Sequence, residues 1–163
     1  MLTVHEAMER LQDDTGFTSW KSSNPDSYLC HCLCMLGDED AWHIGYSNKD
    51  QSMMTFVITR DDITQESSEE VFKKPETEIK PLDFSNVDLT ASQAVALAKE
   101  FQKKEYPQEV LSKYLIVLQH LDVGQVYNLT FVTLAMSTLN IKVDCKTGDI
   151  LSHKRTTLMD FKK

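Results

Sequence analysis

Residues 138–145 read Thr-Leu-Asn-Ile-Lys-Val-Asp-Cys, an unbroken alternation of polar and apolar side chains. In an extended chain Leu139, Ile141 and Val143 face one way, and Asn140 and Lys142 face the other. This period of two is typical of a strand with one buried face and one wet face. The stretch therefore predicts an antiparallel sheet that packs one face against a core.

Five further runs upstream have the composition of strands, and turn residues at 37–40 and 122–124 separate two of the pairs. The predicted strands lie at 28–36, 41–47, 52–60, 113–121 and 125–134. With 138–145 they form two sets of three, one in each half of the chain.

A helix is predicted before each set of strands. Thr3 with Glu6, and Thr90 with Gln93, have the spacing of a capping box, in which the threonine and the later side chain satisfy helix-end N–H groups. Apolar residues recur at helical spacing after both boxes: Val4, Ala7, Met8 and Leu11, then Ala94, Leu97, Ala98 and Phe101. We expect Leu97 and Phe101 to be buried against Leu139, Ile141 and Val143.

The two boxes lie at the same phase and suggest a repeat of about 85–87 residues. The fold class predicted is α+β, as two tandem lobes that each pack one helix on an antiparallel sheet. Residues 1–80 form the first, acidic lobe and residues 81–163 the second. The polar segment 65–88, which contains Pro75 and Pro81, is expected to connect them, with a short edge strand at 70–72.

The second half resembles a PepSY-type domain. The resemblance rests on Leu89-Thr90, Gln93-Ala94 and the ending at 141–151, Ile-Lys-Val-Asp-Cys-Lys-Thr-Gly-Asp-Ile-Leu. The equivalent segment of the first half, 58–63, has no glycine, so the first half resembles a degenerate copy. The resemblance implies a cystatin-like α+β unit with a binding or inhibitory role, often toward peptidases. Members of that family usually lie outside the cytoplasm, joined to peptidase or membrane segments.

Composition argues against several classes of function. The 163 residues include 25 acidic and 17 basic side chains, for a net charge of −8, which disfavours nucleic-acid binding because that binding relies on Lys and Arg. No apolar run reaches the length of a membrane-spanning helix, and the N-terminus lacks the features of a signal peptide. A cytoplasmic location is therefore expected.

Three of the four cysteines, Cys30, Cys32 and Cys34, alternate along one predicted strand, and the fourth is Cys145. Such thiols can form a soft-metal site, or they can pack as small apolar side chains on a buried strand face. We favour the buried face, because Cys-x-Cys-x-Cys lacks the usual two-residue spacing of metal ligands. Reduced thiols without a metal or other cofactor are expected.

An acidic edge is the candidate binding site. Asp38, Glu39 and Asp40 occupy the turn after the first strand, and Asp61 and Asp62 follow the third. In a regular up-and-down sheet these turns fall at the same end, beside Trp42, which could anchor a contact. A basic partner would then associate faster at low salt.

Motifs for nucleotide, serine-hydrolase or zinc-protease chemistry are absent from the sequence. The function expected is therefore that of a non-catalytic protein-binding or regulatory module. The alternatives are a peptidase inhibitor, which the PepSY resemblance implies, and a carrier of a small ligand in a cleft between helix and sheet. The expected partner is a protein, basic or a peptidase.

Overall fold

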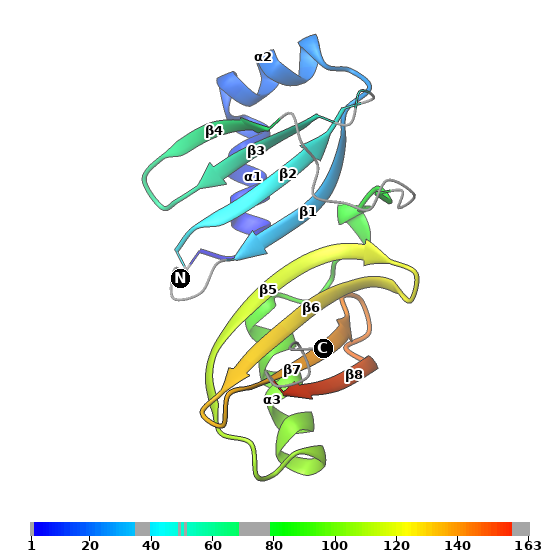
Figure 1. Ribbon diagram of the computed structural model, residues 1–163. Coiled ribbons are helices and arrows are strands. Elements are labelled where there is room, and N and C mark those ends of the chain that lie inside the picture. Colours follow the sequence, from blue (N-terminus) through cyan, green and yellow to red (C-terminus); the bar gives the residue numbers. More distant parts are fainter. Residues whose placement is uncertain (1, 35–39, 49, 51, 69–78, 158–163) are drawn as a thin grey trace.

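The computed structural model describes residues 2–34, 40–48, 50, 52–68 and 79–157. Its main feature is one antiparallel sheet of eight strands in the order β4-β3-β2-β1-β5-β6-β7-β8 (Figure 1). The strands are β1 (Tyr28–Cys34), β2 (Trp42–Ser47), β3 (Met53–Ile58), β4 (Ile63–Ser68), β5 (Leu111–Leu121), β6 (Gly124–Thr133), β7 (Ser137–Asp144) and β8 (Ile150–Thr157). The helices are α1 (Val4–Asp13), α2 (Thr15–Ser23), the short 3-10 helix η1 (Phe84–Asn86) and α3 (Ala91–Glu105).

The prediction of two lobes, each with one helix on its own sheet, is wrong. Strand β1 pairs with β5 in antiparallel register, Cys32 opposite Leu118, so the two halves share a single sheet. The first half also carries two helices rather than one. The physical reason lies in the central strands: both are apolar along one face and half-buried along the other, so neither is suited to be a free edge.

The helices lie on one face of this sheet, behind it in Figure 1. Helix α1 contacts β3, and α3 contacts β6 and β7. Leu139, Ile141 and Val143 are fully buried in the core between these layers, as the alternation of 138–145 predicts. One continuous core cluster joins residues of both halves, including Trp42, Ile44, Phe56, Leu118, Tyr127, Leu129 and Phe131.

Both predicted capping boxes are confirmed: the Thr3 and Thr90 hydroxyls accept from the backbone N–H groups of Glu6 and Gln93. The predicted stripe on α3 is partly wrong. Leu97 is exposed, and Phe101 is only partly buried, although it packs against the core. Ala94 and Ala98 of that stripe are buried as predicted, together with Ala91, Val95 and Gln102. Leu97 lies instead over the turn before β8, where a Cβ placed on Gly148 would be 2.9 Å from Leu97 Cδ1.

The connecting segment predicted at 65–88 is partly structured. Strand β4 extends to Ser68, and η1 occupies 84–86. The short strand predicted at 70–72 lies outside the described residues.

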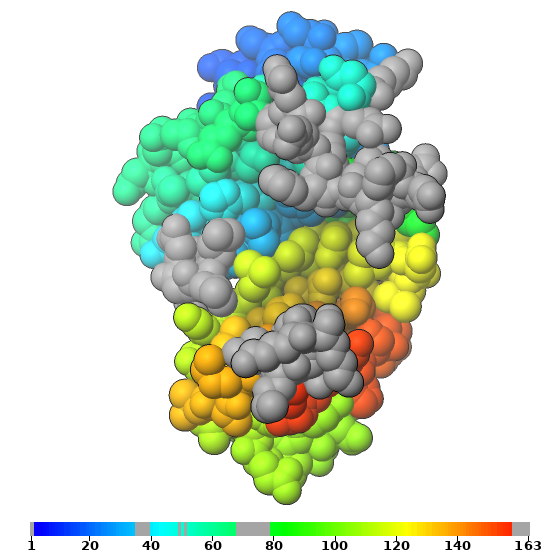
Figure 2. Space-filling view, in the orientation of Figure 1, coloured from blue at the N-terminus to red at the C-terminus, as the bar shows by residue number. Residues whose placement is uncertain are grey.

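Within the described ranges, no helix lies over the other face of the sheet (Figure 1). Figure 2 shows it in the same orientation, where the strands of the first half (blue to green) and of the second half (yellow to orange) meet in one surface. We call this the uncovered face.

Candidate functional site

A row of side chains crosses the uncovered face, one from each strand. From β4 to β8 the paired residues are Thr64, Val57, His43, Leu33, Val117, Asn128, Lys142 and Ser152. Four adjacent positions, Val57, His43, Leu33 and Val117, are half-buried, and three of them are apolar, whereas the remaining positions of the row are polar. A largely apolar centre with a polar border is the anatomy of a protein-binding surface.

The second-half part of the uncovered face is an interlocked polar network. The Asn128 amide donates to Gln119 Oε1 at 3.0 Å, and the Asn140 amide donates to Asn128 Oδ1 at 2.6 Å. Lys142 Nζ donates to Asn140 Oδ1 at 2.8 Å, and Asn140 also donates to the Thr130 hydroxyl at 3.2 Å. These bonds hold the side chains in place before any partner arrives, which lowers the entropy cost of binding.

His31 lies beside the row on β1, opposite Gly45 of β2. A Cβ placed on Gly45 would lie 2.5 Å from His31 Cε1, so the imidazole occupies the space that a side chain at position 45 would need. Burial lowers the pKa of His31, and the neighbouring His43 lowers it further by charge repulsion. Protonation of His31 is therefore disfavoured in the folded protein.

Folding stability should fall as the pH drops below about 6.5, the ordinary pKa of histidine, because the folded protein resists protonation of His31. The contribution of neutral His31 is present above that pH and is lost as the pH falls through its lowered folded-state pKa. Urea unfolding at pH 7.5 and 5.5 measures the loss. His31→Asn should lose less stability over this interval than the parent, and an equal loss in both would contradict the assignment.

Only some of the acidic residues predicted to form a binding edge are among the described residues. Asp38 and Glu39 lie outside the described residues. Asp40, Asp61 and Asp62 are exposed, and the pairing of Trp42 with Ile58 places their two turns at the same end of the sheet. Trp42 itself is buried, with 2% of its surface exposed, and its Nε1 donates to the Leu2 carbonyl at 2.9 Å. That side chain belongs to the core, so it offers a partner no surface.

The four cysteines are buried and form no disulfide. Burial raises the pKa of the Cys30 thiol to about 12 and that of Cys145 to about 11, and it also raises that of Cys32. A bulge between Leu29 and His31 breaks the simple alternation, and Cys30 lies outside the main core cluster, which contains Cys32 and Cys34. Within the part of the chain that the structure describes, no three His, Cys, Asp or Glu residues gather as metal ligands.

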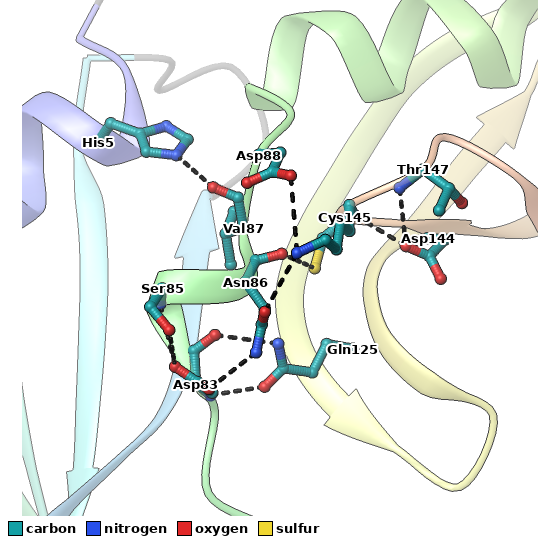
Figure 3. A network of polar contacts seen from close by, with 11 residues as sticks. His5, Asp83, Ser85, Asn86, Val87, Asp88, Gln125, Asp144, Cys145 and Thr147 are labelled. Carbon is teal, nitrogen blue, oxygen red and sulfur yellow. Dashed lines mark hydrogen bonds and ion pairs between the residues drawn. The ribbon is translucent and has the colours of Figure 1, made fainter.

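A second polar cluster joins the two halves around η1 (Figure 3). Asp83 accepts from the Ser85 hydroxyl at 2.6 Å and from the Asn86 amide at 2.8 Å. The Gln125 amide donates to the Asp83 carbonyl at 3.0 Å, and the backbone N–H of Asp88 donates to the Cys145 carbonyl at 3.1 Å. The bond from Ser85 is the main cause that lowers the pKa of Asp83.

His5 of α1 completes the junction, because its Nε2 lies 2.8 Å from the Val87 carbonyl. An open hollow of about 400 Å³ lies beside this cluster, lined by Pro81, His120, Gln125 and Lys146 among others. The polar groups in the cluster bond to one another and to the backbone, so their evident role is to fix η1 between the halves. This cluster was not predicted from the sequence, although Asp83 two residues before Ser85 is a recognisable helix-capping signal.

Among the residues described, no helix is both long enough and apolar enough to cross a membrane. No protein-family model matches the sequence, and no curated protein matches it. The fold is similar to that in a crystal structure titled "putative lipoprotein" from Clostridium difficile 630, with a TM-score of 0.56 and 14% sequence identity. The match covers 89% of this chain and 97% of that one. At this identity the likeness concerns the fold alone.

Proposed function

We propose that the protein is a non-catalytic binding module that engages another protein through the uncovered face. The observation that carries this proposal is the row across all eight strands, in which the apolar side chains of Val57, Leu33 and Val117 lie next to His43. In the described part of the chain, helices cover only one side of the sheet, which leaves these side chains for a second protein to cover. The hydrogen-bonded amides beside them supply directional contacts and pre-organisation.

The state of the reactive groups supports a non-catalytic role. The raised pKa values of Cys30, Cys32 and Cys145 keep these thiols protonated and therefore weakly nucleophilic at neutral pH. His5 and His120 bond to backbone carbonyls, at 2.8 and 2.9 Å, rather than to a nucleophile. Four cysteines without a disulfide also fit a reducing compartment, which supports a cytoplasmic location.

The two halves, on this proposal, are copies of one PepSY-like unit that contribute to a shared sheet. The capping boxes at Thr3 and Thr90 support this view, as does the strand order, in which the four strands of each half run outward from the β1–β5 pair. The resemblance makes a peptidase one candidate partner. The exposed carboxylates of Asp40, Asp61 and Asp62 favour a partner with basic groups at that end of the sheet.

Site-specific photo-crosslinking tests the proposal. A photoreactive side chain replaces Val117 at the centre of the row, or Ala96 on the exposed side of α3 as a matched control. In cells that produce the protein, the probe at position 117 should form a crosslinked adduct of discrete mass. Leu33→Ser should lower the yield of that adduct. The probe at 96 should give none, and equal or stronger adducts from 96 would contradict the proposal.

A further inference from the structure

The turn between β6 and β7 exposes an unusual amount of apolar surface. Leu134 is 68% exposed, Met136 is 62% exposed, and Val110 is 57% exposed. The Leu134 N–H donates to the Val110 carbonyl at 2.9 Å, which brings these residues together. We call Val110, Leu134 and Met136 the apolar tip.

Buried polar groups hold the apolar tip rigidly. The Thr133 and Ser137 hydroxyls lie 2.6 Å apart, and both residues are buried. Ser137 donates to Glu109 at 3.2 Å, and Glu109 is also paired with Arg155. Met136 has a φ of 61°, a conformation that costs energy for a residue other than glycine. A turn that is strained, braced and apolar is suited to insert into a pocket with little further loss of entropy.

A groove with a partly apolar lining lies between α1 of the first half and η1. Its volume is about 490 Å³, a size suited to several side chains. Met8, Phe84 and the ring of His5 line it, and the rings of His5 and Phe84 are 5.2 Å apart. The exposed side chains of Glu9, Gln12 and Asp13 complete its lining.

The charges of the two surfaces are complementary. Residues 1–80 hold 16 acidic and 7 basic side chains, whereas residues 81–163 hold 9 acidic and 10 basic ones. Near the apolar tip, Lys113 follows on β5, and Lys103 and Lys104 are exposed beside Gln102, which donates to the Glu109 carbonyl. Glu100 and Glu105 offset part of this charge. Glu9 and Asp13 lie on α1, whose sequence VHEAMERLQD contains Arg10 and no lysine.

From this complementarity we infer that the apolar tip of one chain inserts into the α1–η1 groove of a second copy. The contact is heterologous, so each chain keeps one free tip and one free groove, and the assembly grows head to tail. It uses neither the row nor the uncovered face, so it goes beyond the proposed function. The small contact area predicts weak, concentration-dependent association. The net charge of −8 disfavours an anionic lipid surface as the alternative occupant of the tip.

Sedimentation velocity from about 10 µM to about 1 mM, a range that covers weak dissociation constants, tests the inference. Three variants accompany the parent. The tip variant is Leu134→Ser with Met136→Asn, since asparagine tolerates a positive φ. The groove variant is Glu9→Lys with Asp13→Lys. The matched control, Asp61→Lys with Glu66→Lys, makes the same charge change at exposed positions elsewhere in the acidic half.

The associated fraction of the parent and of the control should rise with concentration. The tip and groove variants should each have a dissociation constant at least about tenfold higher than that of the parent. An equimolar mixture of the two defective variants should form a complex of two chains and grow no further, because it retains one intact tip and one intact groove. A parent that stays monomeric at every concentration would overturn the inference. A mixture as monomeric as its components, or binding of the parent to anionic vesicles that the tip variant loses, would overturn it as well.

Discussion

Replacing Phe56 by alanine should lower the free energy of unfolding by about 3–5 kcal/mol, the usual cost of removing a buried phenylalanine. Phe56 has no exposed surface and forms the centre of an aromatic cluster. Its ring centroid lies 5.1 Å from that of Phe17, 5.3 Å from that of Trp20 and 6.0 Å from that of Tyr46. The substitution would remove these contacts and leave a cavity under α2.

Val57, the next residue along β3, is the matched control. It points to the uncovered face and is only half-buried, so Val57→Ala should cost no more than about 1 kcal/mol. Urea unfolding of both variants measures the contrast. Similar losses from the two substitutions would contradict the division of the sheet into a covered and an uncovered face.

Gly45→Ala should destabilise the protein by about 1–3 kcal/mol, the usual range for overpacking. The new methyl group would meet the His31 ring at 2.5 Å, so that half-buried ring would have to leave its place. His31→Ala should suppress most of this loss, because it empties the space above position 45.

A double-mutant cycle in urea measures this coupling. The coupling energy between positions 31 and 45 should be at least about 1 kcal/mol, as is usual for residues in direct contact. Gly45→Ala with Ser152→Ala on β8, five strands away in the sheet, is the control and should be nearly additive. Additive effects at 31 and 45 would show that the ring does not fill the site.

Alternation and capping signals were enough to predict much of the fold. The predicted strand at 138–145 corresponds to β7, Ser137–Asp144. Thr3 and Thr90 are the N-caps of α1 and α3. These signals are local, because each depends on side chains within a few residues of one another. The edge strands β4 and β8 escaped prediction, because their sequences are mostly polar and lack an apolar alternation.

The pairing of β1 with β5 could not be predicted in the same way. It joins residues about 85 positions apart, and periodicity says which face of a strand is buried but not which strand lies beside it. The apolar character of both parities in 28–36 was the available hint that this strand is central. The row on the uncovered face depends on that pairing and therefore could not be predicted from the sequence.

The face of the sheet on which a side chain lies also decides whether a predicted site residue can contact a partner. Trp42 was expected to anchor a partner because it follows an acidic turn, yet strand alternation turns it toward α1 and the Leu2 carbonyl. His31 was not among the predicted site residues. Its place depends on Gly45, which leaves room for the imidazole ring on the neighbouring strand.

Amide hydrogen exchange at the junction of β1 and β5 tests the account most directly, because the uncovered face is one surface only if these strands pair. The amides of residues 31–34 and 116–119 should exchange through global unfolding, with the same protection as those of the β6–β7 pair. If the junction amides instead exchange as a separate, faster class while each half stays protected, the halves open apart and the single shared sheet is contradicted.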